Sequence, residues 1–191
     1  MNQENESLEW VTNREKDLNK LLYKSIVWSQ LMGSGQLKVQ KGLCRLLESL
    51  VYTIGTGDIL EIIVDQDVSS FCKIEERLQH KLQVIIFTQK RVCIGTLENP
   101  DNPNSVRCCT LNRSNIKRLS LYAVVPAFDR PEDPERQQLC ITAEYDGLPK
   151  SLVIGSQGAD VNRVFDYQDD ASSFLKKMIH ISQLIIDDLD S

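Results

Sequence analysis

The chain has 191 residues, of which 41% are hydrophobic and 26% are charged, and these values are typical of a globular domain rather than of a chain that is disordered throughout. Its net charge of −5 argues against a general nucleic-acid-binding protein, because contacts to phosphates require a basic surface. The N-terminus is polar from its first residue, unlike a secretory signal, and no apolar run approaches the roughly 18 residues that span a bilayer. We therefore expect a cytoplasmic protein whose six cysteines are thiols.

Two helical segments are predicted at the start of the chain. Apolar residues recur at steps of three and four over residues 4–31, which indicates a helix that is apolar over a wide arc. Two close glycines in Met32–Gln36 are expected to end this helix, and the helical period resumes at Leu37 and stops shortly before Gly55. Residues 1–56 are therefore predicted to form a helical hairpin.

The pattern changes from helical to strand-like after Gly57, and turn signals begin to recur at short intervals. Asp146 and Gly147 form a pair that is typical of a tight turn between the last two strands. Residues 67–80 are predicted to be a loop with a helical turn. The seven predicted strands are 58–65, 82–87, 91–97, 106–111, 116–124, 138–145 and 150–155.

An amphipathic helix is predicted at the end of the chain, because apolar residues repeat at steps of three and four from Ala171 to Ile185. Acidic residues precede this segment and suit a helix start. Carboxylates are unfavourable at the negative end of a helix dipole, where Asp187 and Asp188 would lie. We therefore expect the helix to fray after Ile186.

Seven short strands followed by one helix resemble the pleckstrin-homology (PH) superfold, in particular its PH-like and GRAM branches. The hairpin with Thr88 and Arg91 at its turn is similar to a strand, Thr-x-x-Arg, strand element of these branches. Asn112–Leu121 resembles the polar turn and isoleucine-led strand that follow it, and Asp169–Met178 resembles the start of the terminal helix. The resemblance covers residues 58–188.

This resemblance implies an α+β fold in which two orthogonal sheets form a seven-stranded antiparallel half-barrel that the C-terminal helix closes at one end. The PH-like domain would then occupy residues 57–191 and would follow the helical hairpin of residues 1–56. The alternative is another α+β module, similar to the acidic secretion chaperones.

The best-known activity of the PH family is to bind phosphoinositide headgroups through basic residues at the mouth between the first strands. The corresponding region here does not carry the usual pattern, because Glu75 and Glu76 interrupt its basic residues and oppose a phosphate. We interpret the region as an ordinary stretch of solvent-exposed charged residues. Binding of a membrane phosphoinositide is the alternative. The candidate lipid-binding residues are Lys73, Arg77, Lys81, Lys90 and Arg91.

No catalytic motif is recognisable in the sequence. His80 is predicted in a turn and His180 on the terminal helix as a partly buried structural residue, and no local signature pairs either with a cysteine nucleophile. Asp65 and Asp67 are interpreted as turn formers, and Gly155–Asp160 lacks the lysine and hydroxyl residue of a phosphate-binding loop. The chain is therefore predicted to be a non-catalytic module without a metal ion or a cofactor.

The first helix is the predicted contact element of an adaptor that mediates protein–protein interaction as a subunit of a complex. One apolar stripe is enough for a helix that packs on one side, yet this helix carries two. A second copy of the chain or a different subunit would cover the extra surface, and burial of both stripes within the chain is the alternative. Pro126–Arg136 is interpreted as a solubilising loop rather than a partner site. The candidate partner-binding residues are Leu8, Trp10, Val11, Leu18, Leu21, Leu22 and Trp28.

Overall fold

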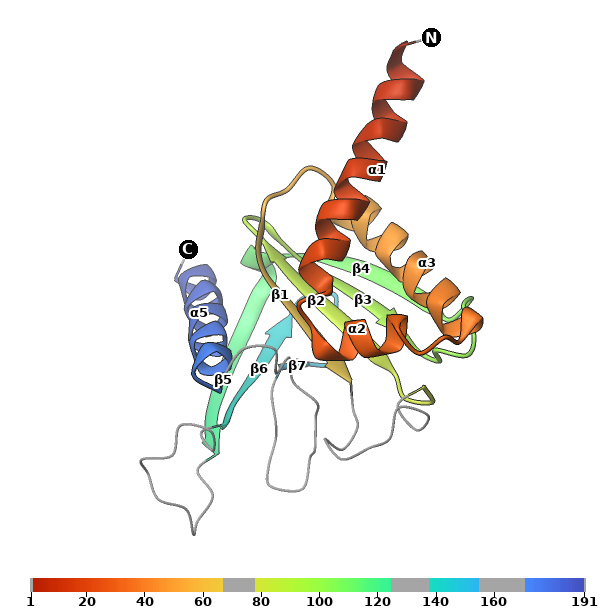
Figure 1. Ribbon diagram of the computed structural model, residues 1–191. Helices are drawn as coiled ribbons and strands as arrows, with labels where there is room; N and C mark the ends of the chain where they lie inside the picture. The colour runs from red at the N-terminus through yellow and green to blue at the C-terminus, as the bar shows by residue number, and fades with distance from the viewer. Residues whose placement is uncertain (1, 67–77, 125–137, 155–170, 191) are drawn as a thin grey trace.

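The computed structural model describes residues 2–66, 78–124, 138–154 and 171–190 and shows an α+β fold with two antiparallel sheets (Figure 1). Most of the predicted loop 67–80 and all of the predicted loop Pro126–Arg136 lie outside the described residues. The first sheet has four strands in the order β1-β2-β3-β4, and the second has three in the order β5-β6-β7. A short 3₁₀ turn, η1, connects the two sheets. The elements are α1 (Asn2–Leu22), α2 (Ile26–Met32), α3 (Leu37–Ile54), β1 (Ile59–Gln66), β2 (Leu82–Thr88), β3 (Arg91–Leu97), β4 (Val106–Asn112), η1 (Arg113–Asn115), β5 (Ile116–Val124), β6 (Gln138–Tyr145), β7 (Leu152–Ile154) and α5 (Ala171–Leu189).

Strands β1 to β3 of the four-stranded sheet are largely buried on both faces, whereas most residues of β4 are exposed or partly exposed. The N-terminal helices lie over one face, and the second sheet with α5 lies on the other side (Figure 1). Alternate side chains of each strand enter different clusters, so that Val84 and Ile86 pack among the helices whereas Ile85 and Phe87 pack toward the second sheet. This double burial explains why β2 is a continuous apolar run rather than an alternating one. Because the helices share a core with the first sheet, residues 1–56 and 57–191 do not bury separate hydrophobic cores.

The single helix predicted over residues 4–31 is wrong, because the chain breaks between α1 and α2. Hydrogen bonds from Lys24 N–H to Leu21 O (3.2 Å) and from Ser25 N–H to Leu22 O (2.9 Å) tighten the end of α1. The buried Ser25 side chain then accepts a hydrogen bond from Trp28 N–H (3.2 Å) and caps α2. The apolar spacing of three and four continues across this break, which is why periodicity alone did not reveal it.

Arg113 on η1 holds the C-terminal end of α5 against the β2–β3 turn. Its guanidinium is 7% exposed and donates to the Asp188 carboxylate (2.7 Å), to Leu184 O (2.8 Å) and to Thr88 O (3.0 Å). The expectation that the helix frays after Ile186 is therefore wrong, since α5 continues to Leu189. The arginine compensates both the carboxylate and a backbone carbonyl at the negative end of the helix.

Two glycines allow α3 to pack closely on β3. A Cβ at Gly95 would lie 2.7 Å from Leu50 Cδ2 and 2.8 Å from Leu46 Cδ1, and both leucines are fully buried. A Cβ at Gly42 of α3 would lie 3.1 Å from Leu97 Cδ2. The helix therefore lies against the strand at a distance that only a missing side chain permits.

Replacing Arg113 with Ala is expected to lower the free energy of unfolding by about 3 kcal/mol, because the nearly buried Asp188 would lose its ion pair with the guanidinium. Lys117→Ala is the matched control: its ion pair with Asp146 is exposed and its loss should cost less than about 1 kcal/mol. Urea denaturation of both variants measures the difference. Equal losses would show that Arg113 contributes no more than a surface charge.

Gly95→Val is expected to lower the free energy of unfolding by about 2 kcal/mol, because the new side chain must displace Leu46 and Leu50 in a packed core. Gly57→Ala is the control, since its Cβ would make only ordinary contacts at 3.5 Å and beyond and should change stability by less than about 0.5 kcal/mol. Unfolding midpoints in urea test this. A neutral Gly95→Val variant would contradict the close packing of α3 on β3.

Candidate binding cleft

The structure divides the predicted partner-binding residues into a buried and an exposed group. Leu18, Leu22 and Trp28 are 0% exposed, so the proposal that they contact a partner is wrong. Trp28 belongs to α2, enters the core beyond the break at residues 23–25 and donates its indole N–H to Asn19 Oδ1 (3.3 Å). These three residues stabilise the packing of the helices on the first sheet.

The remaining predicted contact residues lie on α1. Trp10 is 37% exposed and Leu21 is 36% exposed, whereas Val11 is partly buried against the core. The N-terminal half of α1 extends beyond the rest of the molecule (Figure 1), and the side chain of Leu8 lies outside the described part. Of the candidate partner-binding residues whose side chains are described, Trp10 and Leu21 are therefore the exposed ones.

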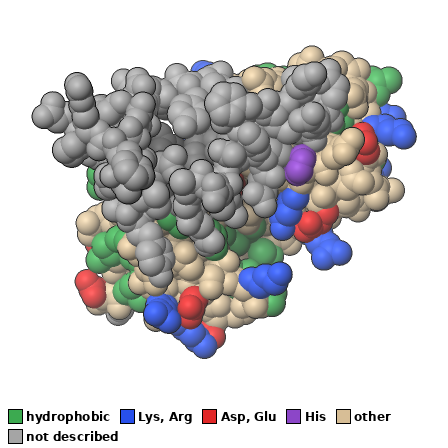
Figure 2. Space-filling model, turned by 90° about the horizontal axis from the view of Figure 1, so that it is seen from below, with side chains coloured by type: hydrophobic (Ala, Val, Ile, Leu, Met, Phe, Trp, Pro, Cys, Tyr) green, Lys and Arg blue, Asp and Glu red, His purple; other side chains and the backbone are tan. Residues whose placement is uncertain are grey.

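The described phosphoinositide candidates, Lys81, Lys90 and Arg91, do not lie together on one site. Lys81 precedes β2 and pairs with Glu98 (3.5 Å), while Lys90 and Arg91 lie at the turn beyond its other end. A strand rises about 3.3 Å per residue, so roughly 20 Å separates the two ends. Lys73 and Arg77 lie outside the described residues. On the described part of the face in Figure 2, basic and acidic side chains are interspersed and form no continuous basic patch.

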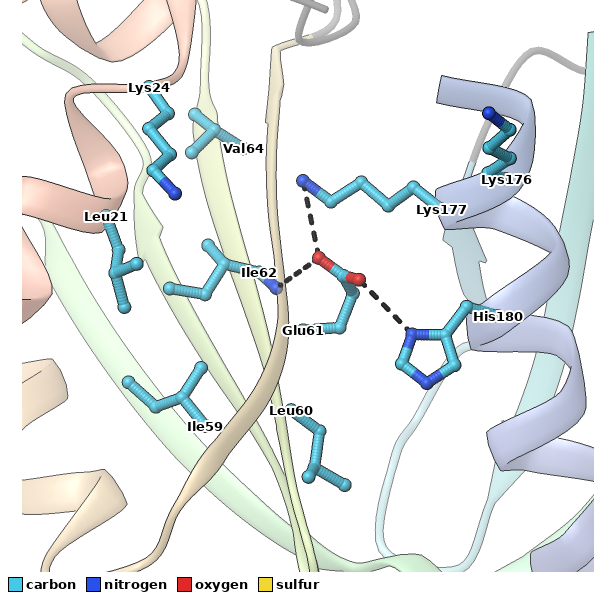
Figure 3. A pocket seen from close by; sticks show the side chains of 10 residues that line it. All are labelled: Leu21, Lys24, Ile59, Leu60, Glu61, Ile62, Val64, Lys176, Lys177 and His180. Atoms are coloured by element: carbon cyan, nitrogen blue, oxygen red, sulfur yellow. Dashed lines mark hydrogen bonds and ion pairs between the residues drawn. The ribbon is translucent and has the colours of Figure 1, made fainter. Parts of the chain in front are cut away.

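A cleft of about 470 Å³ lies between β1 and α5 and is bordered by the end of α1. We call it the β1–α5 cleft (Figure 3). It brings together segments that are more than a hundred residues apart in the sequence. Its apolar lining residues are Leu21, Ile59, Leu60, Ile62 and Val64.

Glu61 is at the centre of the charged groups in this cleft. Its carboxylate lies 3.4 Å from Lys177 Nζ and 3.4 Å from His180 Nδ1, both on α5, and accepts a hydrogen bond from Ile62 N–H (3.1 Å) (Figure 3). His180 is exposed, so its prediction as a partly buried structural histidine is wrong. It lies on the polar side of α5, whereas the next residue, Ile181, is buried in the core. Two further lysines, Lys24 and Lys176, also line the cleft.

The β1–α5 cleft contains the outer edge of the first sheet. β1 pairs with β2 on one side only, and no described strand pairs with its other edge. Because the Ile62 amide donates to Glu61, this amide points away from β2 and into the cleft. Strand alternation then places the Val64 amide on the same edge. The cleft therefore offers backbone hydrogen-bonding groups between an apolar and a basic wall.

Sequence reasoning missed this cleft, although part of its signal was present. Lys176, Lys177 and His180 follow helical spacing and so share one side of a helix. Nothing in the sequence indicated that this side faces β1. The contact between the two elements depends on the packing of α5 against the second sheet.

The described cysteines near the first sheet are not suited to nucleophilic chemistry. Desolvation raises the pKa of the Cys108 thiol to about 11, although a hydrogen bond with Thr53 lowers it and the nearby Cys109 and Cys93 raise it. Burial also raises the pKa of Cys93 and of Cys109. Thiolates are the nucleophilic form, so the raised pKa values disfavour nucleophilic chemistry at these three thiols. Among the described residues, no group of three or more histidine, cysteine, aspartate or glutamate side chains is placed to hold a metal ion.

No protein-family model, curated protein or solved structure matches this chain. None of the described helices combines the length and the apolar character required to cross a membrane.

Iodoacetamide at pH 7 is expected to modify the exposed Cys44 well before Cys108, because a pKa of about 11 leaves only about one Cys108 thiol in ten thousand ionised. The rate at Cys108 should rise about tenfold for each pH unit between 7 and 9. Mass spectrometry of digested samples measures both rates, and the urea-unfolded chain provides the reference. Fast labelling of Cys108 at pH 7 would contradict the effect of burial.

Proposed function

We propose that this chain is a non-catalytic adaptor module of the cytoplasm, with a PH-like fold, that binds a protein partner in the β1–α5 cleft. The single observation that supports this function is the outer edge of β1 inside the cleft, with which no described strand pairs. An edge strand that can accept another strand is a common means of binding a peptide segment. The partner is a different protein or a second copy of the chain.

The strand order supports a PH-like interpretation of the fold. Four antiparallel strands are followed by three more, and the terminal helix contacts β5 and β6 of the second sheet. The N-terminal helices are an addition to that pattern, because they cover the outer face of the first sheet. This cover removes the outer face of β1 to β3 from contact with a partner and leaves the edge of β1 inside the cleft.

A non-catalytic role is supported by the chemistry of the cleft. The carboxylate of Glu61 is engaged by Lys177, His180 and the Ile62 amide. A general base must be within reach of a substrate proton, whereas this carboxylate is already occupied by three donors. The described groups of the cleft therefore suit recognition better than proton transfer.

An anionic lipid headgroup is the competing ligand, because Lys24, Lys176 and Lys177 line the same cleft. Its recognition would use the lysines alone. It would leave the apolar wall and the backbone edge without a role, so we favour the protein partner.

Photo-crosslinking from within the cleft tests this function. A photo-reactive phenylalanine analogue in place of Leu60, which lines the cleft, is expected to form adducts of protein size in native lysate. The same analogue in place of Tyr52, exposed on α3, should form few. Adducts with lipid alone, or equal protein adducts from both positions, would contradict a protein-binding cleft.

A further inference from the structure

We propose that the β1–α5 cleft binds an extended partner segment in which apolar and acidic residues alternate, and that this segment adds to the edge of β1 as a further strand. This inference rests on the proposed protein-binding function and specifies the partner's chemistry. Three features of the cleft support it: the direction of the β1 amides, the different character of the two walls, and the contacts of the Glu61 carboxylate.

The edge of β1 offers a ladder of hydrogen-bonding groups. The Ile62 amide faces the cleft, and its present acceptor is a side chain rather than a strand. Residues two apart in a strand direct their amides to the same edge, so Val64 continues the ladder. Both residues line the cleft but are buried in the free chain, Ile62 at 9% and Val64 at 1% exposed. An extended segment would therefore have to widen the cleft in order to meet their backbone groups at strand spacing.

The two walls of the cleft differ in polarity. The side chains of Ile62 and Val64 pack into the cluster formed with the N-terminal helices, and Leu21 of α1 lies on this side (Figure 3). On the other side, α5 contributes the basic residues Lys177 and His180 (Figure 3). The side chains of an added strand would alternate between the two walls.

This alternation gives the preferred sequence of the bound segment. Side chains that point to the helices would meet apolar groups, whereas those that point to α5 would meet cationic ones. Lys24 lies on the helix side of the opening (Figure 3) and, with Lys176 and Lys177 of α5, is one of the three described lysines that line the cleft. In a chain with a net charge of −5, these lysines make acidic side chains the favoured complement at the opening.

Glu61 occupies the position that the partner would take. Its carboxylate accepts from the Ile62 amide and pairs with Lys177, as a backbone carbonyl and an acidic side chain of a bound strand would do. A charged side chain at an edge strand also protects the edge against unwanted pairing. Glu61 is thus a built-in competitor of the ligand, and its removal should favour binding.

A short synthetic peptide in which valine and glutamate alternate tests this inference with the full chain. Titration followed by NMR is expected to shift the Ile62 and Val64 amides and to slow their exchange with solvent. A peptide of the same composition with its valines and glutamates in two separate blocks should bind at least about tenfold more weakly, since it cannot match both walls. Methylation of alternate backbone nitrogens on the edge that faces β1 should abolish binding, because it removes the donors of the ladder.

Variants of the chain provide a second test. The double variant Lys24→Glu and Lys176→Glu is expected to weaken binding about tenfold, because two favourable charge contacts become repulsive. Lys38→Glu and Lys41→Glu together are the matched control, since both lysines are exposed on α3 away from the cleft, and should leave affinity unchanged. Glu61→Ala is expected to tighten binding several-fold. Far-ultraviolet circular dichroism checks that each variant retains its secondary structure.

The outcomes separate this inference from the proposed function. Equal binding of the alternating and blocked peptides, or of the methylated peptide, would overturn strand addition. Binding to vesicles that contain phosphoinositide but not to any peptide would overturn it in favour of a headgroup. Protein adducts from position 60 together with failure of every peptide would reject the alternating acidic segment and leave the protein-binding function intact. Absence of such adducts would remove the function itself.

Discussion

The burial of both faces of strands β1 to β3 in the first sheet is the constraint on which the rest of the structure depends. A sheet with one solvent-exposed face needs only one layer of structure packed against it. Strands that are apolar throughout, such as β2 and β3, need a layer on each face. The N-terminal helices supply one layer, and the second sheet with α5 supplies the other. The close approach of α3 at Gly95 and the capped break at Ser25 both follow from fitting helices to this sheet.

Strands β1 to β3 are covered on both faces, so the outer edge of β1 is one of the surfaces that the described part of the first sheet offers to other molecules. β4 forms one edge and β1 the other, and the β1 edge opens into the cleft beside α5. The position of α5 is set by apolar contacts of Met178, Ile181 and Ile185 and by the guanidinium of Arg113. The basic wall of the cleft is thus formed by a helix, α5, whose position is fixed by its packing on the second sheet.

The sequence predicted local structure well and spatial relations poorly. All seven strands appear, with β7 shortened to Leu152–Ile154, because alternation and turn residues act over a few positions. The break before α2 was missed, since the buried Ser25 cap leaves the apolar spacing intact. The extension of α5 was missed because the residue that stabilises it, Arg113, is 75 positions from Asp188. The cleft depends on a similar pairing of distant segments, and single-sequence patterns carry no signal for that.

The anchoring of α5 also determines how the cleft can change its width. Arg113 grips the last turns of the helix through Leu184 and Asp188, whereas the basic residues of the cleft lie nearer its other end. The cleft can therefore widen by a rigid-body rotation of α5 about its contact with Arg113. In such a rotation the displacement of a residue grows with its distance from Arg113, so Lys176 moves further than Ser182. A substitution at Arg113, remote from any ligand, would loosen this contact and with it the spacing between the basic wall and the β1 edge.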